Sequence, residues 1–189
     1  MGERPLAAGL NLFPRIEKPV TAAAPGPTAA TAAADPMSLV HLKVAQVEEV
    51  EEHPNADALY VLKLGLAGEA RTVCAGLRKH LSKEELRGRK VVLVYNLKPA
   101  NLRGVESQGM ILAAEGEGGR LVPASPDGNP GEDVTAEGIV PAPKPGLTLK
   151  EFALAPLVVQ GGAVTYAGRP LRTSRGGVAA AAPDGAQVR

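Results

Sequence analysis

The sequence predicts an all-β protein, a five-stranded Greek-key β-barrel with one short helix and a C-terminal extension packing on it. Three observations support this prediction. Five segments between residues 39 and 116 have the alternating or continuous apolar pattern of β-strands. One capped-helix signal lies between the third and the fourth of these segments. The 22 Gly and 17 Pro residues favour frequent turns over long helices.

The first strand is predicted at residues 39–50. Apolar and polar residues alternate along it as far as Val44, and the pattern then slips by one position to Val47, which indicates a β-bulge. Two further strands are predicted at residues 58–68 and 70–77, each ending in a glycine turn or an exposed polar segment.

The helix is predicted to follow the third strand. Ser82 has Glu85 three residues later, which is the pattern of a capping box, and Gly88 is a typical helix stop. Residues 89–97 form a nearly continuous apolar run that indicates a buried fourth strand, and residues 109–116 form the fifth. Five strands with a helix between the third and the fourth match the OB-fold, whose ligands include oligonucleotides.

Composition divides the chain into three parts. Residues 1–36 are a predicted flexible leader and linker rich in Ala, Pro and Thr. Residues 37–141 are the predicted barrel domain. Residues 142–189 contain a short helix, ended by Pro156, and weak strands that are too short to fold alone, so we expect this extension to pack against the barrel.

Charge is segregated along the sequence although the net charge is only +1. Residues 71–103 contain nine basic and two acidic residues, a net charge of +7, and residues 142–189 contain six basic and two acidic residues, a net charge of +4. Such segregation favours binding of a polyanion. The alternative interpretation is an ordinary solvated charged surface.

Several classes of function are disfavoured. No apolar run approaches the roughly 18 residues needed to cross a bilayer, so no membrane partner is predicted. His41, His53, His80 and Cys74 show no metal-ligand spacing, and no cofactor or metal is predicted. The single cysteine suits a reducing compartment, and its strand context indicates a packed thiol. Because the sequence shows no nucleophile–base pair, we predict no catalytic residues and no enzyme activity for this chain.

Three long segments carry a family resemblance. They are HPNADALYVLKL (residues 53–64), RTVCAGLRKHLSKEEL (residues 71–86) and GRKVVLVYNLKPANLRGVESQGMILAA (residues 88–114). Together they resemble the tRNA-binding domain family, which includes the C-terminal domain of many methionyl-tRNA synthetases and the endothelial monocyte-activating polypeptide domain. The resemblance covers about residues 38–140. It implies an OB-fold that binds tRNA without catalysing a reaction.

The flanking segments extend the resemblance. Residues 161–189 are similar to the extension of the polypeptide branch, with Tyr166-Ala167-Gly168 where that branch has Tyr-Lys-Gly, so one family cation is missing. The resemblance implies a monomer whose extension imitates the second subunit of dimeric relatives, forming a pseudo-dimer interface. Residues 10–17 are similar to the segment that joins methionyl-tRNA synthetases to this domain. The resemblance fits two alternatives, a fragment of such a synthetase and a free-standing protein derived from one.

The candidate RNA-binding residues follow the third and fourth strands. Folded RNA is recognised through phosphates, 2′-hydroxyls and shape, which calls for cations and small polar donors on a rigid platform. The cations are Arg78, Lys79, Lys98 and Arg103, and the polar donors are Asn96, Asn101, Ser107 and Gln108. The family more often has Lys at the place of Asn101. Aromatic residues, at 3%, are too sparse to predict base stacking.

The predicted function is a non-catalytic module that binds tRNA and tethers or delivers it to an aminoacyl-tRNA synthetase. The predicted partners are tRNA and a synthetase or a subunit of a multi-synthetase complex. The alternative is a protein-interaction scaffold subunit that docks through residues 10–17 or the extension. The predicted location is the cytoplasm, with a plastid or mitochondrion as the alternative, because Glu3 and Glu17 argue against a transit peptide.

Overall fold

The computed structural model describes residues 35–189, so the predicted leader and linker, with the segment 10–17, lie outside the described residues apart from the last two positions. Pro36–Arg189 form one compact unit. The predicted boundary between residues 141 and 142 stays a prediction. The short helices are η2 (Pro36–Leu39), α2 (Lys83–Leu86), η3 (Glu117–Gly119) and α3 (Leu149–Phe152).

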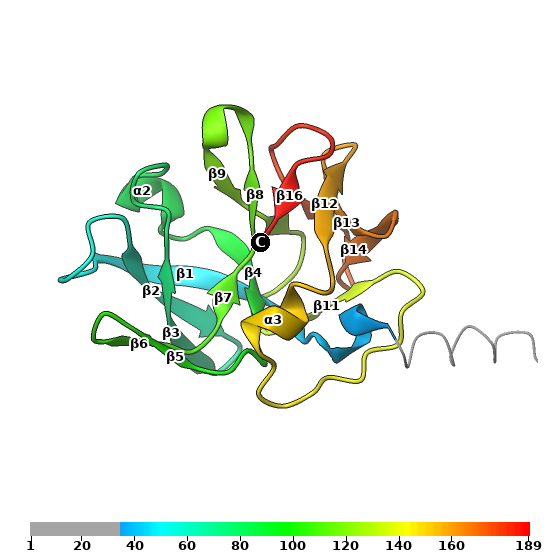
Figure 1. Cartoon of the computed structure of the whole chain (residues 1–189), viewed down its shortest axis with the longest axis horizontal. Helices are drawn as coiled ribbons and strands as arrows, with labels where there is room; N and C mark the ends of the chain where they lie inside the picture. Colours follow the sequence, from blue (N-terminus) through cyan, green and yellow to red (C-terminus); the bar gives the residue numbers. More distant parts are fainter. Residues whose placement is uncertain (1–34) are drawn as a thin grey trace, which may run out of the picture. The chain divides into compact units, whose positions relative to one another are not determined.

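The described residues are mostly β, as predicted (Figure 1). The strands are β1 (Leu42–Glu52), β2 (Tyr60–Leu66), β3 (Glu69–Ala75), β4 (Lys90–Val94), β5 (Ala100–Leu102), β6 (Val105–Ser107), β7 (Met110–Ile111), β8 (Ala113–Glu115), β9 (Leu121–Pro123), β10 (Ser125–Pro126), β11 (Asp133–Ala136), β12 (Leu157–Gln160), β13 (Ala163–Tyr166), β14 (Arg169–Arg172), β15 (Val178–Ala179) and β16 (Gln187–Val188).

Strand β1 organises the fold. It pairs antiparallel with β2, β4 and β11, while β3 pairs with β2 and β7 pairs with β4. We call β3-β2-β1-β4-β7 the five-strand sheet. The register between β1 and β2 shifts between Val47 and Glu49, so β1 does contain a β-bulge, but it lies after Val47 and not between Val44 and Val47 as predicted. The earlier slip in the pattern arises because Val44 faces one hydrophobic cluster and Val47 faces the other.

The prediction of a five-stranded Greek-key barrel of the OB type is confirmed only as an all-β architecture, because the described residues form more than five strands. The hydrogen-bonded sheet does not close, because β3 and β7 share no ladder; the backbone N–H of Gln108 donates to the Thr72 carbonyl at 2.8 Å instead. The predicted fifth strand is also divided. Leu112 donates its N–H to Val92, so that β7 stays with β4, while β8 pairs with β9 and β16.

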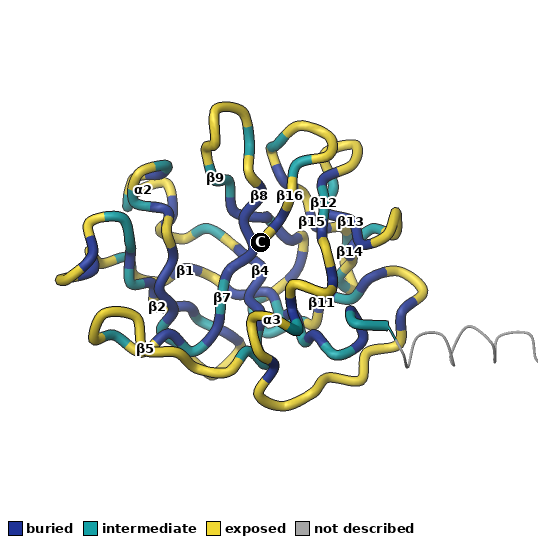
Figure 2. Tube along the Cα trace, viewed as in Figure 1, coloured by how far each residue is buried: buried dark blue, intermediate teal, exposed yellow. Residues whose placement is uncertain are grey.

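Two hydrophobic clusters lie on either side of β4. Val91 and Leu93 point into one cluster, which fills the inside of the five-strand sheet, and Val92 and Val94 point into the other. This explains the continuous apolar run of residues 89–97, because both faces of the strand are buried (Figure 2). β1 likewise contributes residues to both clusters.

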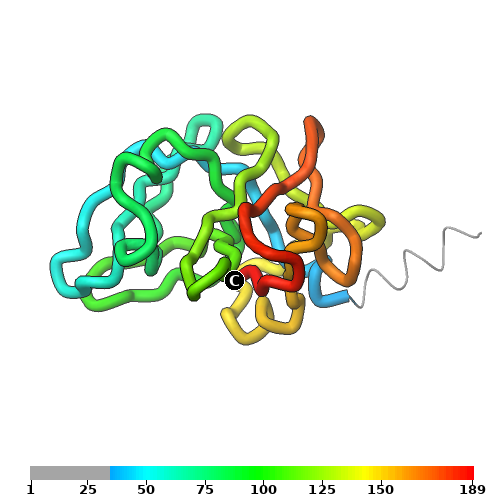
Figure 3. The backbone as a smooth tube through the Cα atoms, turned by 90° about the horizontal axis from the view of Figure 1, so that it is seen from above, coloured from blue at the N-terminus to red at the C-terminus, as the bar shows by residue number. Residues whose placement is uncertain are grey.

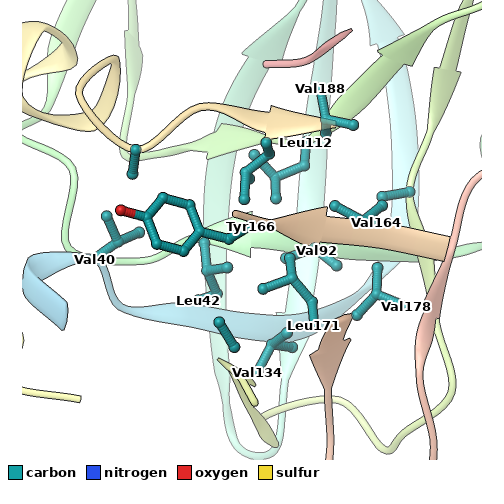
Figure 4. Packing of buried hydrophobic residues seen from close by; sticks show 14 of the residues in the cluster. Val40, Leu42, Val92, Leu112, Val134, Val164, Tyr166, Leu171, Val178 and Val188 are labelled. Atoms are coloured by element: carbon teal, nitrogen blue, oxygen red, sulfur yellow. The ribbon is translucent and has the colours of Figure 1, made fainter. Parts of the chain in front are cut away.

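The second cluster joins the five-strand sheet to the extension. β14 pairs with β11, and β16 pairs with β8. Figure 3 shows the red C-terminal end of the chain against the light-green region that contains β8. Leu157, Val164 and Leu171 from the extension pack with Leu42 and Val92 from the sheet. Figure 4 shows the Tyr166 ring among these side chains.

The two α-helices of residues 35–189 each begin at a capping box. At α2 the Ser82 hydroxyl accepts from the Glu85 N–H and the Glu85 carboxylate accepts from the Ser82 N–H, as predicted. Thr148 and Glu151 form the same arrangement at α3. Since a four-residue helix is too short to be stable through its own backbone bonds, these reciprocal bonds and the buried Leu86 and Phe152 fix its position.

Candidate nucleic-acid interface

The segment predicted as a phosphate-binding loop is a β-hairpin. β5 and β6 pair with Leu102 opposite Val105, which leaves Arg103 and Gly104 as a two-residue turn. Both turn residues have positive φ, 52° for Arg103 and 100° for Gly104, as a type I′ turn requires. All three residues of β5 are exposed (Figure 2). The hairpin therefore presents Arg103 at its tip on a defined backbone.

The loop between β1 and β2 braces this tip. The His53 ring is buried, and its Nε2 lies 2.8 Å from the Leu102 carbonyl. The Asn55 side chain donates to the Arg103 carbonyl at 3.1 Å, and the Arg103 guanidinium donates to the Asn55 carbonyl at 3.3 Å. These contacts give the HPNAD segment a structural role and hold Arg103 in its left-handed conformation.

The second predicted group of cations lies beside the same loop. Glu52, at the end of β1, forms ion pairs with Arg78 at 2.5 Å and Lys83 at 2.9 Å. The hydrogen bond from Lys83, followed by the charge of Arg78, lowers the pKa of the Glu52 carboxyl. Lys79 is exposed and forms no ion pair among the described residues. Thus Arg78 is partly neutralised, whereas Lys79 keeps its full charge.

Two of the predicted polar donors are occupied within the protein. Ser107 is 5% exposed; its Oγ accepts from the Cys74 N–H at 3.0 Å and donates to the Gly109 carbonyl at 2.9 Å. Asn96 donates both amide hydrogens, to the carbonyls of Leu39 and Lys144, and accepts from the His41 N–H. The geometry assigns these two side chains to structural roles.

The other predicted donors differ in accessibility. Asn101 is exposed, and its Oδ1 accepts from the Gly104 N–H at 2.9 Å, which leaves its amide hydrogens facing solvent. Gln108 is half-buried next to β3. Lys98 is exposed, and its backbone N–H donates to the Leu147 carbonyl at 2.7 Å, so the extension fixes the base of the hairpin.

Eight cations of the described chain form no ion pair, and they are unevenly distributed. Three belong to the predicted site and three surround the end of α2 and the start of β4. Within residues 35–189 the cations without an ion pair are Lys79, Arg87, Arg89, Lys90, Lys98, Arg103, Lys150 and Arg169. The structure thus joins Arg78, Lys79 and Arg103 around one loop, with Lys98 at the opposite end of the hairpin.

Sequence reasoning missed a second group at the base of the hairpin. The Arg71 guanidinium lies 3.9 Å from the centroid of the Tyr95 ring, and its Nε donates to Glu69 at 2.6 Å. The hydrogen bond from Arg71 is the main cause of the lowered pKa of the Glu69 carboxyl, and a bond from the Tyr95 hydroxyl adds to it. The sequence signal was a single Tyr beside the NLKPA segment, which the low aromatic content obscured.

Residues 35–189 contain no group of three His, Cys, Asp or Glu side chains that could hold a metal ion. No helix among them is both long and apolar enough to span a membrane. Cys74 is buried, and desolvation raises the pKa of its thiol, in agreement with the predicted packed thiol.

Comparison with known families accounts for this arrangement. A family model described as a putative tRNA binding domain matches residues 42–133. Residues 42–133 belong to the tRNA-binding domain family. This confirms the resemblance found in the sequence. The matched region contains β1 to β10, the braced hairpin and all eight candidate residues.

Relatives of the tRNA-binding domain occur inside much longer proteins. The methionine–tRNA ligase of Pyrococcus furiosus is 52% identical over 90 residues, which are 48% of this chain and 12% of that enzyme. The cytoplasmic tyrosine–tRNA ligase of Gallus gallus is 41% identical over 140 residues, 66% of this chain and 27% of that enzyme. The chain therefore corresponds to a small part of these relatives.

A solved structure resembles both the tRNA-binding domain and the extension. The C-terminal domain of Plasmodium vivax p43 has a TM-score of 0.72 and 29% sequence identity, and the likeness covers 81% of this chain and 98% of that one. Because residues 42–133 make up less than half of the chain, the likeness includes much of the extension.

Proposed function

We propose that this chain is a non-catalytic module that binds tRNA through phosphate and ribose contacts and tethers it to an aminoacyl-tRNA synthetase. The observation that carries the proposal is the braced β5–β6 hairpin, which holds exposed cations without carboxylate partners on a rigid platform within a family defined by tRNA binding. No base-reading helix is needed, since folded RNA exposes its backbone and shape.

The proposed contacts differ in weight. Lys79, Lys98 and Arg103 are the main phosphate ligands because no carboxylate competes for them among the described residues. Arg78 contributes less, since binding RNA must displace or share its ion pair with Glu52. Asn101 supplies an amide hydrogen to a phosphate or ribose oxygen, and Gln108 supplies a weaker one from its half-buried position.

The direct test is an anisotropy titration of labelled bulk tRNA at 50 and 200 mM salt. If about four to six phosphates are neutralised, the slope of log affinity against log salt is roughly −3 to −5. Lys98→Ala weakens binding and reduces the steepness of this slope by about one. Arg78→Ala has a smaller effect, and Arg78→Ala/Lys98→Ala/Arg103→Ala abolishes most of the binding.

Lys63→Ala is the matched control. It removes one positive charge, but Lys63 lies on β2 and is paired with Glu49 at 2.9 Å, next to other acidic residues of β1. The proposal requires that Lys63→Ala leave tRNA affinity nearly unchanged. Absence of binding by the parent, or an equal loss in Lys63→Ala and Lys98→Ala, contradicts it.

Tethering is the proposed use of this binding. A weak but nearby RNA site raises the effective concentration of tRNA at a linked catalytic site. We therefore expect the cation variants to raise the KM for tRNA of the associated synthetase and to leave kcat unchanged. The synthetase-linked relatives support this use, and it favours the cytoplasm as the location.

We further propose that the five-strand sheet is a partly open OB-fold barrel and that the extension takes the place of a second subunit. Leu42, Val92 and Leu112 lie on the side of the sheet that the extension covers, and all three are fully buried. An uncovered face of this kind would associate with a second copy. Sedimentation equilibrium is therefore expected to give the monomer mass.

A second candidate function, a scaffold subunit, is favoured by one observation. Leu149, the first residue of α3, and Leu154, two residues after its end, are 59% and 65% exposed. Two exposed large apolar side chains five residues apart in the chain favour a protein contact. A partner synthetase bound through α3 would be lost in Leu149→Ser/Leu154→Ser and retained in Lys98→Ala, which separates this function from RNA binding.

A further inference from the structure

A groove of about 400 Å³ lies at the base of the β5–β6 hairpin. Its lining includes Tyr95 and Arg71, together with four apolar residues, Leu97, Pro99, Pro143 and Pro145. The groove is thus bounded by an aromatic ring, a guanidinium and apolar rings. Its volume is within the range of small-molecule sites, and its lining suits a flat ligand.

Arg71 and Tyr95 in the lining of the groove are held rigid by hydrogen bonds. Arg71 donates to the Glu69 carboxylate at 2.6 Å and to the Tyr95 carbonyl at 3.2 Å, and the Tyr95 hydroxyl donates to the same carboxylate at 3.2 Å. The His41 ring contacts Tyr95 edge-on at 5.2 Å between centroids. Tyrosine rings and arginine planes are the surfaces on which unpaired RNA bases stack. Here the Arg71 guanidinium already lies over the Tyr95 ring, 3.9 Å from its centroid, and the Lys43 Nζ lies 5.3 Å from the same centroid, so Arg71 and Tyr95 form one stack that is fixed before any ligand arrives.

The groove adjoins the proposed phosphate site. Pro99, one of its lining residues, follows Lys98 directly in the chain, and the backbone N–H of Lys98 donates to the carbonyl of Leu147, two residues after the lining residue Pro145. A nucleotide whose phosphate contacts Lys98 can therefore place its base in the groove. Only an unpaired base can do so, because a paired base is stacked within its helix.

We propose that this groove binds one unpaired base of the RNA by stacking on the Tyr95–Arg71 platform. This proposal rests on the proposed tRNA-binding function and adds a base subsite to it. The groove offers few free hydrogen-bonding groups to the edge of a base. The Asn96 amide is fully used within the protein, and Lys144 is paired with Glu151. The subsite accepts purines and pyrimidines alike, because every base offers a flat face.

The test compares Tyr95→Phe, Tyr95→Leu and Tyr95→Ala with the parent chain, using anisotropy titrations of bulk tRNA and of a blunt-ended RNA duplex. Tyr95→Phe keeps the ring and binds tRNA like the parent. Tyr95→Ala and Tyr95→Leu weaken tRNA binding about 5- to 150-fold, the range for loss of one stacked base. Their affinity for the duplex and their salt slope stay unchanged, since no charge is removed.

Tyr95→Leu guards against a folding artefact, because it retains apolar volume where Tyr95 packs against the cluster that contains Val91 and Leu93. Thermal melting of each variant verifies the fold. Unchanged tRNA binding in Tyr95→Leu, or an equal loss for tRNA and duplex, overturns the base subsite while the phosphate site stands. Failure of the parent to bind either RNA overturns the proposed function and the subsite together.

Discussion

Arg103 and Ala167 have left-handed backbone conformations without being glycine, with φ of 52° and 50°. Each is followed by a glycine of positive φ, and each pair forms the two-residue turn of a β-hairpin. For an ordinary residue this conformation costs about 1–2 kcal/mol. At Arg103 the contacts with Asn55 offset the strain and aim a cation outward, whereas Ala167 is an exposed methyl at the same geometry.

Ala167→Asn is therefore expected to stabilise the protein. Asn-Gly is the preferred sequence of a type I′ turn, because Asn tolerates positive φ better than Ala. The gain is about 0.5–1 kcal/mol, which raises the melting temperature by roughly 1–4 °C in a chain of this size. Ala167→Val places a β-branched residue at positive φ and is expected to lower the melting temperature. A melting temperature that falls in Ala167→Asn contradicts this account of the turn.

Residue types predicted the candidate site only in part. Lys79, Lys98 and Arg103 could be chosen from the sequence because long cations after strands are exposed. Ser107 and Asn96 could not be separated from them, since their bonds to Cys74, Leu39 and Lys144 join segments far apart in the chain. A pattern of residue types carries no information on which polar groups a distant backbone will occupy.

Helix α3 shows how a short element depends on charge. Glu151 accepts hydrogen bonds from Lys144 and from the Thr148 backbone and hydroxyl. These bonds, with Lys144 first, lower the pKa of the Glu151 carboxyl from 4.5 to about 2. The carboxylate closes the capping box and also connects the helix to the segment that follows Pro143.

The effect of Glu151 on stability is expected to depend on pH. Because its pKa is lower in the folded state, its stabilisation is complete above pH 4.5 and is lost as the pH falls from 4.5 to about 2. Gln also closes a capping box, so Glu151→Gln removes only the charge. The variant melts below the parent at pH 7, and the difference closes toward pH 2. If the difference in melting temperature between Glu151→Gln and the parent is the same at pH 7 and pH 3, this role of the carboxylate is excluded.

Strands whose apolar pattern follows from burial were predicted more accurately than the short exposed strands. β2, β4 and helix α2 lie within the predicted segments, whereas β1 runs two residues past its predicted end and β3 begins one residue before its predicted start. The agreement is close because apolar periodicity and the capping box are local signals. The β5–β6 hairpin was taken for a loop, since its strands are exposed and short. The fifth strand was predicted as one element, but β7 and β8 separate because two distant partners compete for its backbone.

The whole molecule depends on strands shared by two hydrophobic clusters. β1 and β4 bury residues in both, so neither cluster can open without exposing part of the other. The extension completes the cluster that contains Val92 and Val94 through Leu171 and Val164, both fully buried. We therefore expect residues 36–189 to unfold as one cooperative unit.

Leu171→Ala tests this coupling. Removal of a fully buried leucine side chain costs about 2–5 kcal/mol in free energy of unfolding. Leu154→Ala, at a side chain that is 65% exposed, is expected to change the free energy of unfolding by less than about 0.5 kcal/mol. Urea unfolding should show one transition with the parent's denaturant dependence in both variants. A separate early transition in Leu171→Ala would show that the extension unfolds alone.

The pairing of β16 with β8 has a consequence for synthesis on the ribosome. Val188 pairs with Ala114, so β8 lacks one of its partners until residue 188 has been made. At about 5–20 residues per second, residues 142–189 take roughly 2–10 s to be added. During that interval the nascent five-strand sheet exposes Leu42, Val92 and Leu112 to its surroundings. Chaperones that recognise apolar strands would meet this chain then, before β16 is in place.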